Sequence, residues 1–170
     1  MKKLISILLA AVMVAAFAAC GNNGGTPAGN KVTDPLEVLN KVWSSLPEDQ
    51  KFPASGGDTE NPTDDKPGAF GISDTDSLDY MLSFPAGSVD LIDSAASISH
   101  MMNMNTFTCG AYHAADAKNV SKLADDLRAA IQGKQWMCGF PDKLVIVTMD
   151  NYVLGMYGDE ELINTFRDKL

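Results

Sequence analysis

Apolar residues recur every three or four positions in four parts of the chain, the spacing that lets one face of an α-helix be buried. Asp34 and Pro35 suit the start of the first of these helices, and Asp159 suits the start of the last. The expected helices lie at 35–46, 74–84, 120–132 and 160–170.

Between these helices, alternating or β-branched apolar residues indicate strands. Residues 95–101 and 106–112 flank a turn-forming stretch at 103–105, so we expect a hairpin with Ile98 opposite Cys109. Residues 144–149 are predicted as a central strand, and 152–157 as its neighbour. This ββα-ββα order predicts an α+β fold with a four-stranded, mostly antiparallel sheet whose helices cover one face.

Two of these strands are similar in type. Residues 107–112 and 152–157 each begin with an aromatic residue, have glycine in fourth place and end in tyrosine. The similarity is a hint of internal duplication, and the alternative is chance over so short a segment.

The N-terminal segment has the pattern of a secretory signal. Lys2 and Lys3 precede 16 residues, 4–19, that are apolar apart from Ser6. As a helix this stretch would measure about 24 Å, which is short of the roughly 30 Å hydrocarbon core of a bilayer. No basic cluster follows it, so we predict a signal peptide and not a membrane span.

Residues 17–21, Phe-Ala-Ala-Cys-Gly, resemble the cleavage site of bacterial lipoproteins, where small residues precede a cysteine. The resemblance implies that a diacylglyceryl group with palmitate-type chains is attached to Cys20, that residues 1–19 are removed, and that the new N-terminus is often acylated. Two or more acyl chains anchor a protein stably, here on the extracytoplasmic face of the cell membrane. The alternative is an ordinary secretory signal followed by a chance cysteine.

Composition divides the remaining chain. Residues 20–31 are rich in glycine and asparagine and are predicted as a flexible tether. An N-terminal helix at 32–47 is expected to dock on the domain, and the acidic, Pro/Gly-rich stretch at 48–68 is interpreted as a linker. The α+β domain is expected at 69–170.

Charge excludes one class of partner. Loss of 1–19, with its two lysines, leaves 11 basic and 22 acidic residues, a net charge of −11. A surface this acidic repels phosphate backbones, so nucleic acid is not expected as a partner.

Residues able to bind a metal gather near the expected hairpin. His100, Met101, Met104 and His113 offer imidazole and thioether ligands, which suit copper. Neighbouring strand residues point to opposite faces, and methionine is common core filler. Packing is therefore the interpretation that we favour, and no cofactor is predicted.

With Cys20 lipidated, Cys109 and Cys138 form an even pair in an exported domain, which predicts a disulfide. The alternatives are two buried free thiols and a thiol-dependent enzyme with His113 as the base. No Cys-x-x-Cys motif or other catalytic signature supports the enzyme.

Two further groups each have a structural and a functional interpretation. The carboxylates at 58–65 could hold calcium loosely, but they lack the spacing of a calcium loop, and a solvated acidic linker is favoured. Trp136 and Phe140 lie in the expected helix–strand loop, where exposed aromatic residues can form a binding surface. The alternative is that Trp136 closes the core.

Residues 100–108, 135–144 and 151–154 look like small uncharacterised lipoproteins of Gram-positive gut bacteria, some of which are described as bacteriocin transport accessory proteins. The resemblance covers the chain from about residue 32 to the end. It implies a lipoprotein with an α+β domain, and it brings no catalytic residues with it.

We therefore expect a lipid-anchored, non-catalytic binding or accessory module at the cell surface, with a surface protein or wall component as its partner. The alternatives are a thiol-dependent enzyme and a copper-handling protein, which would use Cys109, Cys138, His100 and His113.

Replacement of Cys20 by Ala tests the anchor. Without the thiol no lipid can be attached, so we expect the protein in the medium or as an uncleaved precursor. Membrane fractionation with detergent partitioning measures this, and Ser6→Ala, which keeps the cysteine, is the control. A processed, acylated Cys20→Ala protein would contradict the lipoprotein interpretation.

Overall fold

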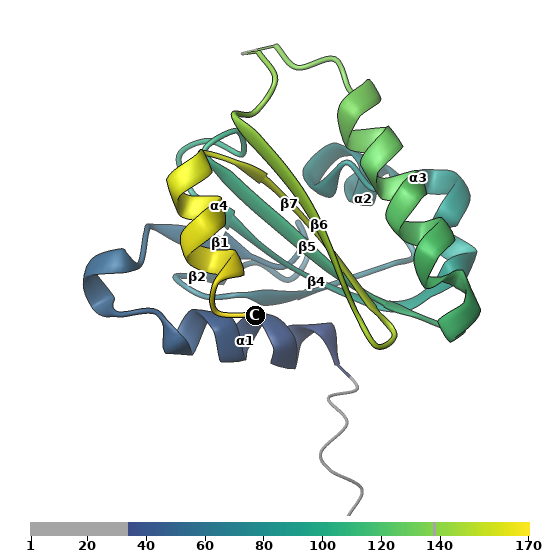
Figure 1. Ribbon diagram of the computed structural model, residues 1–170, viewed down its shortest axis with the longest axis horizontal. Helices are drawn as coiled ribbons and strands as arrows, with labels where there is room; N and C mark the ends of the chain where they lie inside the picture. The colour runs from purple at the N-terminus through teal and green to yellow at the C-terminus, as the bar shows by residue number, and fades with distance from the viewer. Residues whose placement is uncertain (1–33, 138) are drawn as a thin grey trace, which may run out of the picture. The chain divides into compact units, whose positions relative to one another are not determined.

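The chain folds around a seven-stranded antiparallel sheet, which the computed structural model shows with four α-helices over residues 34–137 and 139–170 (Figure 1). The fold is therefore α+β, as predicted. The predicted signal peptide, the predicted lipidation site Cys20, the predicted tether at 20–31 and Cys138 lie outside the described residues.

The strands lie in the order β2-β1-β4-β5-β7-β6, and β3 also pairs with β4. The strands are β1 Ala54–Gly56, β2 Thr63–Asp64, β3 Gly68–Phe70, β4 Ile92–His100, β5 Phe107–Ala114, β6 Lys143–Met149 and β7 Tyr152–Gly158. The helices are α1 Pro35–Ser45, α2 Thr75–Leu82, α3 Val120–Gly133 and α4 Glu160–Arg167.

The hairpin expected from the sequence is confirmed, because β4 pairs with β5 and Ile98 lies opposite Cys109. Two other expectations about the sheet are wrong. It has seven strands and not four, because three short strands from residues 54–70 join it. β6, expected at the centre, is an edge strand whose apolar residues are covered by α3 and α4. A β-branched apolar run fits either position.

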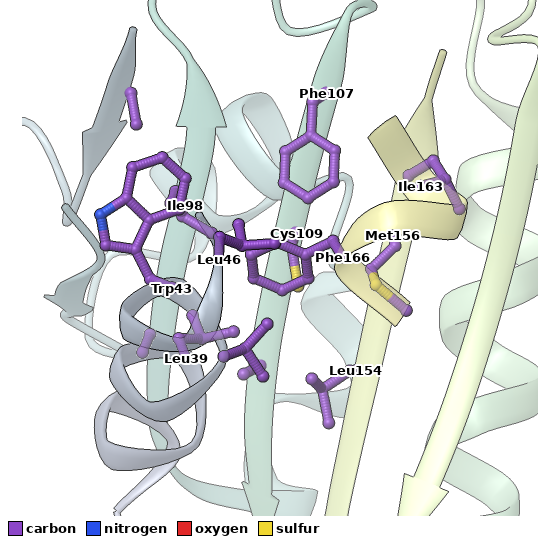
Figure 2. Close-up of a cluster of buried hydrophobic side chains, with 14 of the residues drawn as sticks. Leu39, Trp43, Leu46, Ile98, Phe107, Cys109, Leu154, Met156, Ile163 and Phe166 are labelled. Atoms are coloured by element: carbon purple, nitrogen blue, oxygen red, sulfur yellow. The ribbon is translucent and has the colours of Figure 1, made fainter. Parts of the chain in front are cut away.

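Helices cover both faces of the sheet, and not one face as expected (Figure 1). On one face, Trp43 of α1 and Phe166 of α4 share a cluster with Cys109 and Met156 of the sheet (Figure 2). On the other face, α2 and α3 bury a second set of side chains against the sheet. That set includes Leu78, Leu82, Leu123, Leu127 and Ile131.

The two central strands, β5 and β7, explain this second layer of helices. Successive side chains of a strand point to opposite faces of the sheet. On β7, Leu154 and Met156 join the α1–α4 cluster, whereas Val153 and Tyr157 join the α2–α3 cluster. A strand that is apolar on both sides needs cover on both sides, which one layer of helices cannot give.

Residues 48–68, predicted as a linker, contain part of the sheet. β1 and β3 lie in line along one edge of β4, where Gly56 pairs with Ile98 and Gly68 pairs with Ser97. A Cβ at Gly56 would lie 2.3 Å from the backbone nitrogen of Gly68, so a side chain there would clash with backbone. The domain therefore includes this segment, whose high glycine content reflects close packing.

The N-terminal helix packs against the domain, as we expected from the sequence. The indole Nε1 of Trp43 donates a hydrogen bond to the carbonyl oxygen of Asp65, at 3.0 Å. Asp34 caps the helix as predicted, because its Oδ1 accepts a hydrogen bond of 2.8 Å from the backbone N–H of Leu36. Residues 34–170 thus belong to one compact unit.

The loop between β1 and β3 is held by the buried carboxylate of Asp58. Its Oδ1 accepts hydrogen bonds from the backbone N–H groups of Glu60 (2.9 Å) and Asn61 (2.8 Å), and its Oδ2 accepts one from Gly71 (2.7 Å). Burial opposes ionisation, but these hydrogen bonds outweigh it and place the pKa of Asp58 below its usual value. This carboxylate is therefore structural, and its oxygens face N–H donors.

We expect Asp58→Asn to lower the free energy of unfolding by about 1–3 kcal/mol at neutral pH, because an amide has only one acceptor oxygen and leaves a buried N–H donor unpaired. The folded pKa of Asp58 is lowered, so its stabilisation is present above the unfolded pKa of about 4 and is lost as the pH falls through the folded pKa. Urea unfolding at neutral pH and at about pH 3 measures both effects.

The matched control for Asp58→Asn is Asp64→Asn, at an exposed carboxylate of β2. It should change the free energy of unfolding by less than about 0.5 kcal/mol. Equal losses from the two substitutions would contradict the structural role of Asp58.

Candidate binding surface

Most of the large hydrophobic side chains that the described residues expose gather at one end of the sheet. This end, the loop end, consists of the β4–β5 turn (101–106), the α3–β6 loop (134–137 and 139–142) and Tyr80 in the last turn of α2. It holds five of the six exposed large hydrophobic residues. They are Tyr80 (72 % exposed), Met101 (52 %), Met102 (80 %), Met137 (100 %) and Phe140 (50 %).

Strand register brings the two loops together. Phe107 at the start of β5 and Lys143 at the start of β6 both lie opposite Gly158 of β7. The turn before β5 and the loop before β6 are therefore at the same end of the sheet. Asn105 links them, because its Nδ2 donates a hydrogen bond of 3.2 Å to the carbonyl oxygen of Gly139.

Lys134 joins the end of α3 to the end of α2. Its Nζ donates hydrogen bonds to the carbonyl oxygens of Asp79 (2.9 Å) and Tyr80 (3.1 Å). Burial lowers the pKa of Lys134, and the charge of Asp79 opposes this shift. A cation at the last carbonyls of a helix is stabilising, so this contact holds Tyr80 in position at the loop end.

The two aromatic residues singled out in the sequence have different environments. Trp136 is half-buried, packs edge-on against Tyr157 at 5.1 Å between ring centroids, and donates its indole N–H to the carbonyl oxygen of Ile131 (3.1 Å). Phe140 is half exposed, and its ring centroid lies 6.2 Å from that of Trp136. Trp136 thus supports the loop from the core side, and Phe140 forms part of its surface.

A cleft of about 240 Å³ opens beside Phe140. It is lined by Asn105, Thr106, Phe140, Pro141, Asp142 and Asp159. The neighbouring Lys143 points its charge elsewhere, because its Nζ contacts Glu160 Oε1 and Asn164 Oδ1, both at 2.8 Å. The cleft therefore combines an apolar wall with two carboxylates that this lysine does not neutralise.

The residues considered as copper ligands are not brought together. His100 Nδ1 accepts a hydrogen bond from the backbone N–H of Met102, at 3.2 Å. His113 lies near the far end of β5, roughly 20 Å away along the strands. Met101 is exposed and Met104 half-buried in the turn. Among the described residues, no group of three or more His, Cys, Asp or Glu side chains is placed to hold a metal ion.

Cys109 is fully buried beneath α1 and α4 and is bonded to no other cysteine of the described residues (Figure 2). Burial raises its pKa far above the usual value, so the thiol stays protonated and is unsuited to act as a nucleophile. Its predicted disulfide partner, Cys138, lies outside the described residues. The disulfide therefore stays a prediction.

Sequence reasoning named Met101, Trp136 and Phe140 as candidates but missed other residues of the loop end. Tyr80 and Met137 belong to no motif, and Asp142 and Asp159 were not considered as neighbours. One signal was present in the predicted order of elements. The starts of two strands that pair antiparallel with a common partner lie at the same end of a sheet, so the segments that precede them are neighbours.

No family model, curated protein or solved structure matches the chain. In the part of the chain that the structure describes, no helix has the length and apolar character needed to cross a membrane.

We expect Cys109 to react with a maleimide only when the reduced protein unfolds, because the thiolate is the reactive form and burial suppresses it. Mass spectrometry of labelled protein measures this, with Asp125→Cys on the exposed side of α3 as a rapidly labelled control. Rapid labelling of Cys109 in the reduced native protein would contradict its burial. Labelling of Cys138 without reductant would show that the disulfide is absent.

Proposed function

We propose that the protein is a lipid-anchored, non-catalytic binding module on the extracytoplasmic face of the membrane, and that the loop end contacts a protein or wall component at the cell surface. The observation that carries this proposal is the group of exposed hydrophobic residues on two loops that hydrogen bonds tie to the fold. Exposed apolar patches with a polar rim are typical of interaction sites, and binding residues concentrate on loops of rigid scaffolds.

The position of α1 supports the proposal, because α1 begins at the end of the sheet opposite the loop end. β6 begins with Lys143 at the loop end and leads to the turn at Asp150, about 20 Å away. Trp43, near the end of α1, packs on Phe52, which stacks on His100 where β4 ends at the loop end. α1 therefore ends near the loop end and begins, at Asp34, away from it. The predicted anchor at Cys20 therefore precedes, along the chain, the end of the domain that lies opposite the loop end.

The groups that could perform acid–base chemistry support binding over catalysis. Asp93 Oδ1 lies 2.7 Å from His113 Nδ1 and accepts a hydrogen bond of 3.1 Å from Ser94 Oγ. A histidine activates a serine or cysteine when the two are hydrogen-bonded to each other. Here His113 and Ser94 both bind the same carboxylate oxygen, and the thiol of Cys109 is buried.

Site-specific photo-crosslinking in intact cells tests the proposal. A benzophenone amino acid at Met137, which is fully exposed at the loop end, should form an adduct with a surface protein or wall component. The same probe at Asn151, in the turn at the far end, should not. The Met137 adduct should weaken when Met102→Asp is added, because a charge disrupts the apolar surface.

Two outcomes would contradict the proposed function. One is equal cross-linking from both positions. The other is absence of any adduct from Met137 in cells where fractionation places the protein at the membrane.

A further inference from the structure

We propose that the cleft at the loop end receives a lysine or arginine side chain of a partner polypeptide, while the surrounding methionines contact apolar residues next to it in the partner. This inference rests on the proposed function, because it names the partner chemistry of the same surface. The partner segment is therefore both basic and apolar.

The size and lining of the cleft fit one long side chain. Its volume of about 240 Å³ is below the roughly 300–1,000 Å³ of typical small-molecule pockets. Phe140 and Pro141 provide an apolar wall, and Asp142 and Asp159 provide carboxylates. Lysine and arginine bury an aliphatic stem on apolar surface while the charged head stays at a polar edge. The lining offers contacts to both parts.

Among the described residues, neither Asp142 nor Asp159 forms a salt bridge. Lys143 is engaged by groups on α4, and Lys134, the other lysine of the loop end, is engaged by the carbonyls of α2. Asp159 caps α4 through Oδ1 alone, and its Oδ2 accepts no hydrogen bond from the described residues. An incoming ammonium or guanidinium group is therefore complementary in charge to the cleft.

The apolar part of the surface is adaptable. Met101 and Met102 lie in the turn that contributes Asn105 to the cleft, and Met137 lies in the loop that contributes Phe140. Methionine is flexible and polarisable, and it is common on surfaces that bind varied apolar sequences. The surface thus requires apolar character in the partner and no single sequence.

The net charge of the chain favours a basic polypeptide over other possible ligands of the cleft. After loss of residues 1–19 the chain has a net charge of −11. A second copy of the chain, an anionic lipid surface and a phosphate polymer are all repelled by such a charge. A basic polypeptide is attracted, and its association should be faster at low ionic strength.

Fluorescence anisotropy with three synthetic peptides tests the inference on the mature full chain carrying Cys20→Ala. The probe is a peptide of alternating lysine and leucine, and the controls are lysine–serine and glutamate–leucine peptides of equal length. We expect the lysine–leucine peptide to bind at least about tenfold more tightly than either control at low ionic strength, because only it matches both halves of the surface.

Paired substitutions place the binding at the cleft. Asp142→Asn with Asp159→Asn should weaken the lysine–leucine peptide at least about threefold, because two charge pairs are lost while asparagine still caps α4. Asp125→Asn with Asp150→Asn removes the same charge elsewhere and should change affinity less than about twofold. Thermal unfolding followed by circular dichroism confirms that both variants are folded.

Several outcomes would overturn the inference. Equal weakening by the two variants would show general charge attraction. Tight binding of the glutamate–leucine peptide would show that the loop end binds apolar residues without selecting a cationic side chain. This result would overturn the inference and would still agree with the proposed function. Failure of all three peptides to bind would reject the inference. The proposed function would not be affected, because the photo-crosslinking experiment at Met137 tests it separately. A dimer by light scattering that Phe140→Ser abolishes would assign the surface to a second copy.

Discussion

The pairing of β5 with β7 is the interaction on which the rest of the structure depends. Seven residue pairs join the two strands, and β7 is buried along its whole length. Because both faces of these strands are apolar, the chain must supply helices for both: α1 and α4 on one side, α2 and α3 on the other. Contact with α3 is close at Gly155, where a Cβ would lie 2.7 Å from Cδ2 of Leu127.

This arrangement restricts where a binding surface can form. Both faces of the central strands are covered, and one edge of β4 is occupied by β1 and β3. Most of the large hydrophobic side chains that the described residues expose are instead carried by the loops at one end of the sheet. At the loop end, hydrogen bonds of Lys134 and Asn105 fix the loop that carries Phe140 and Met137. The hydrogen bonds give the loop end a defined shape.

Local patterns were sufficient to predict the main helices, the caps at Asp34 and Asp159, and the β4–β5 register, because each depends on neighbours in the sequence. The covering of both faces and the short strands depend on distant partners. β1 and β3 have three residues each, which is too few to show the alternation of apolar and polar residues that indicates a strand. Their glycines are also typical of a flexible linker. The cleft was missed for the same reason: Asn105, Phe140 and Asp159 meet only through strand register. Lipidation of Cys20 stays a prediction.

The similar segments 107–112 and 152–157 raise the question whether the two halves of the sheet are symmetric copies of each other. They pair with Gly110 opposite Gly155, as two copies related by a two-fold axis normal to the sheet would. Such an axis preserves the faces of the sheet, so both following helices would lie on one face. They lie on opposite faces, α3 with the α2 cluster and α4 with the α1 cluster. The similarity therefore reflects the similar residue types that two adjacent, buried central strands need. Because the helices break the two-fold symmetry, the far end of the sheet is not a copy of the loop end. Among the described residues, the exposed methionines Met101, Met102 and Met137 therefore lie at one end of the sheet only.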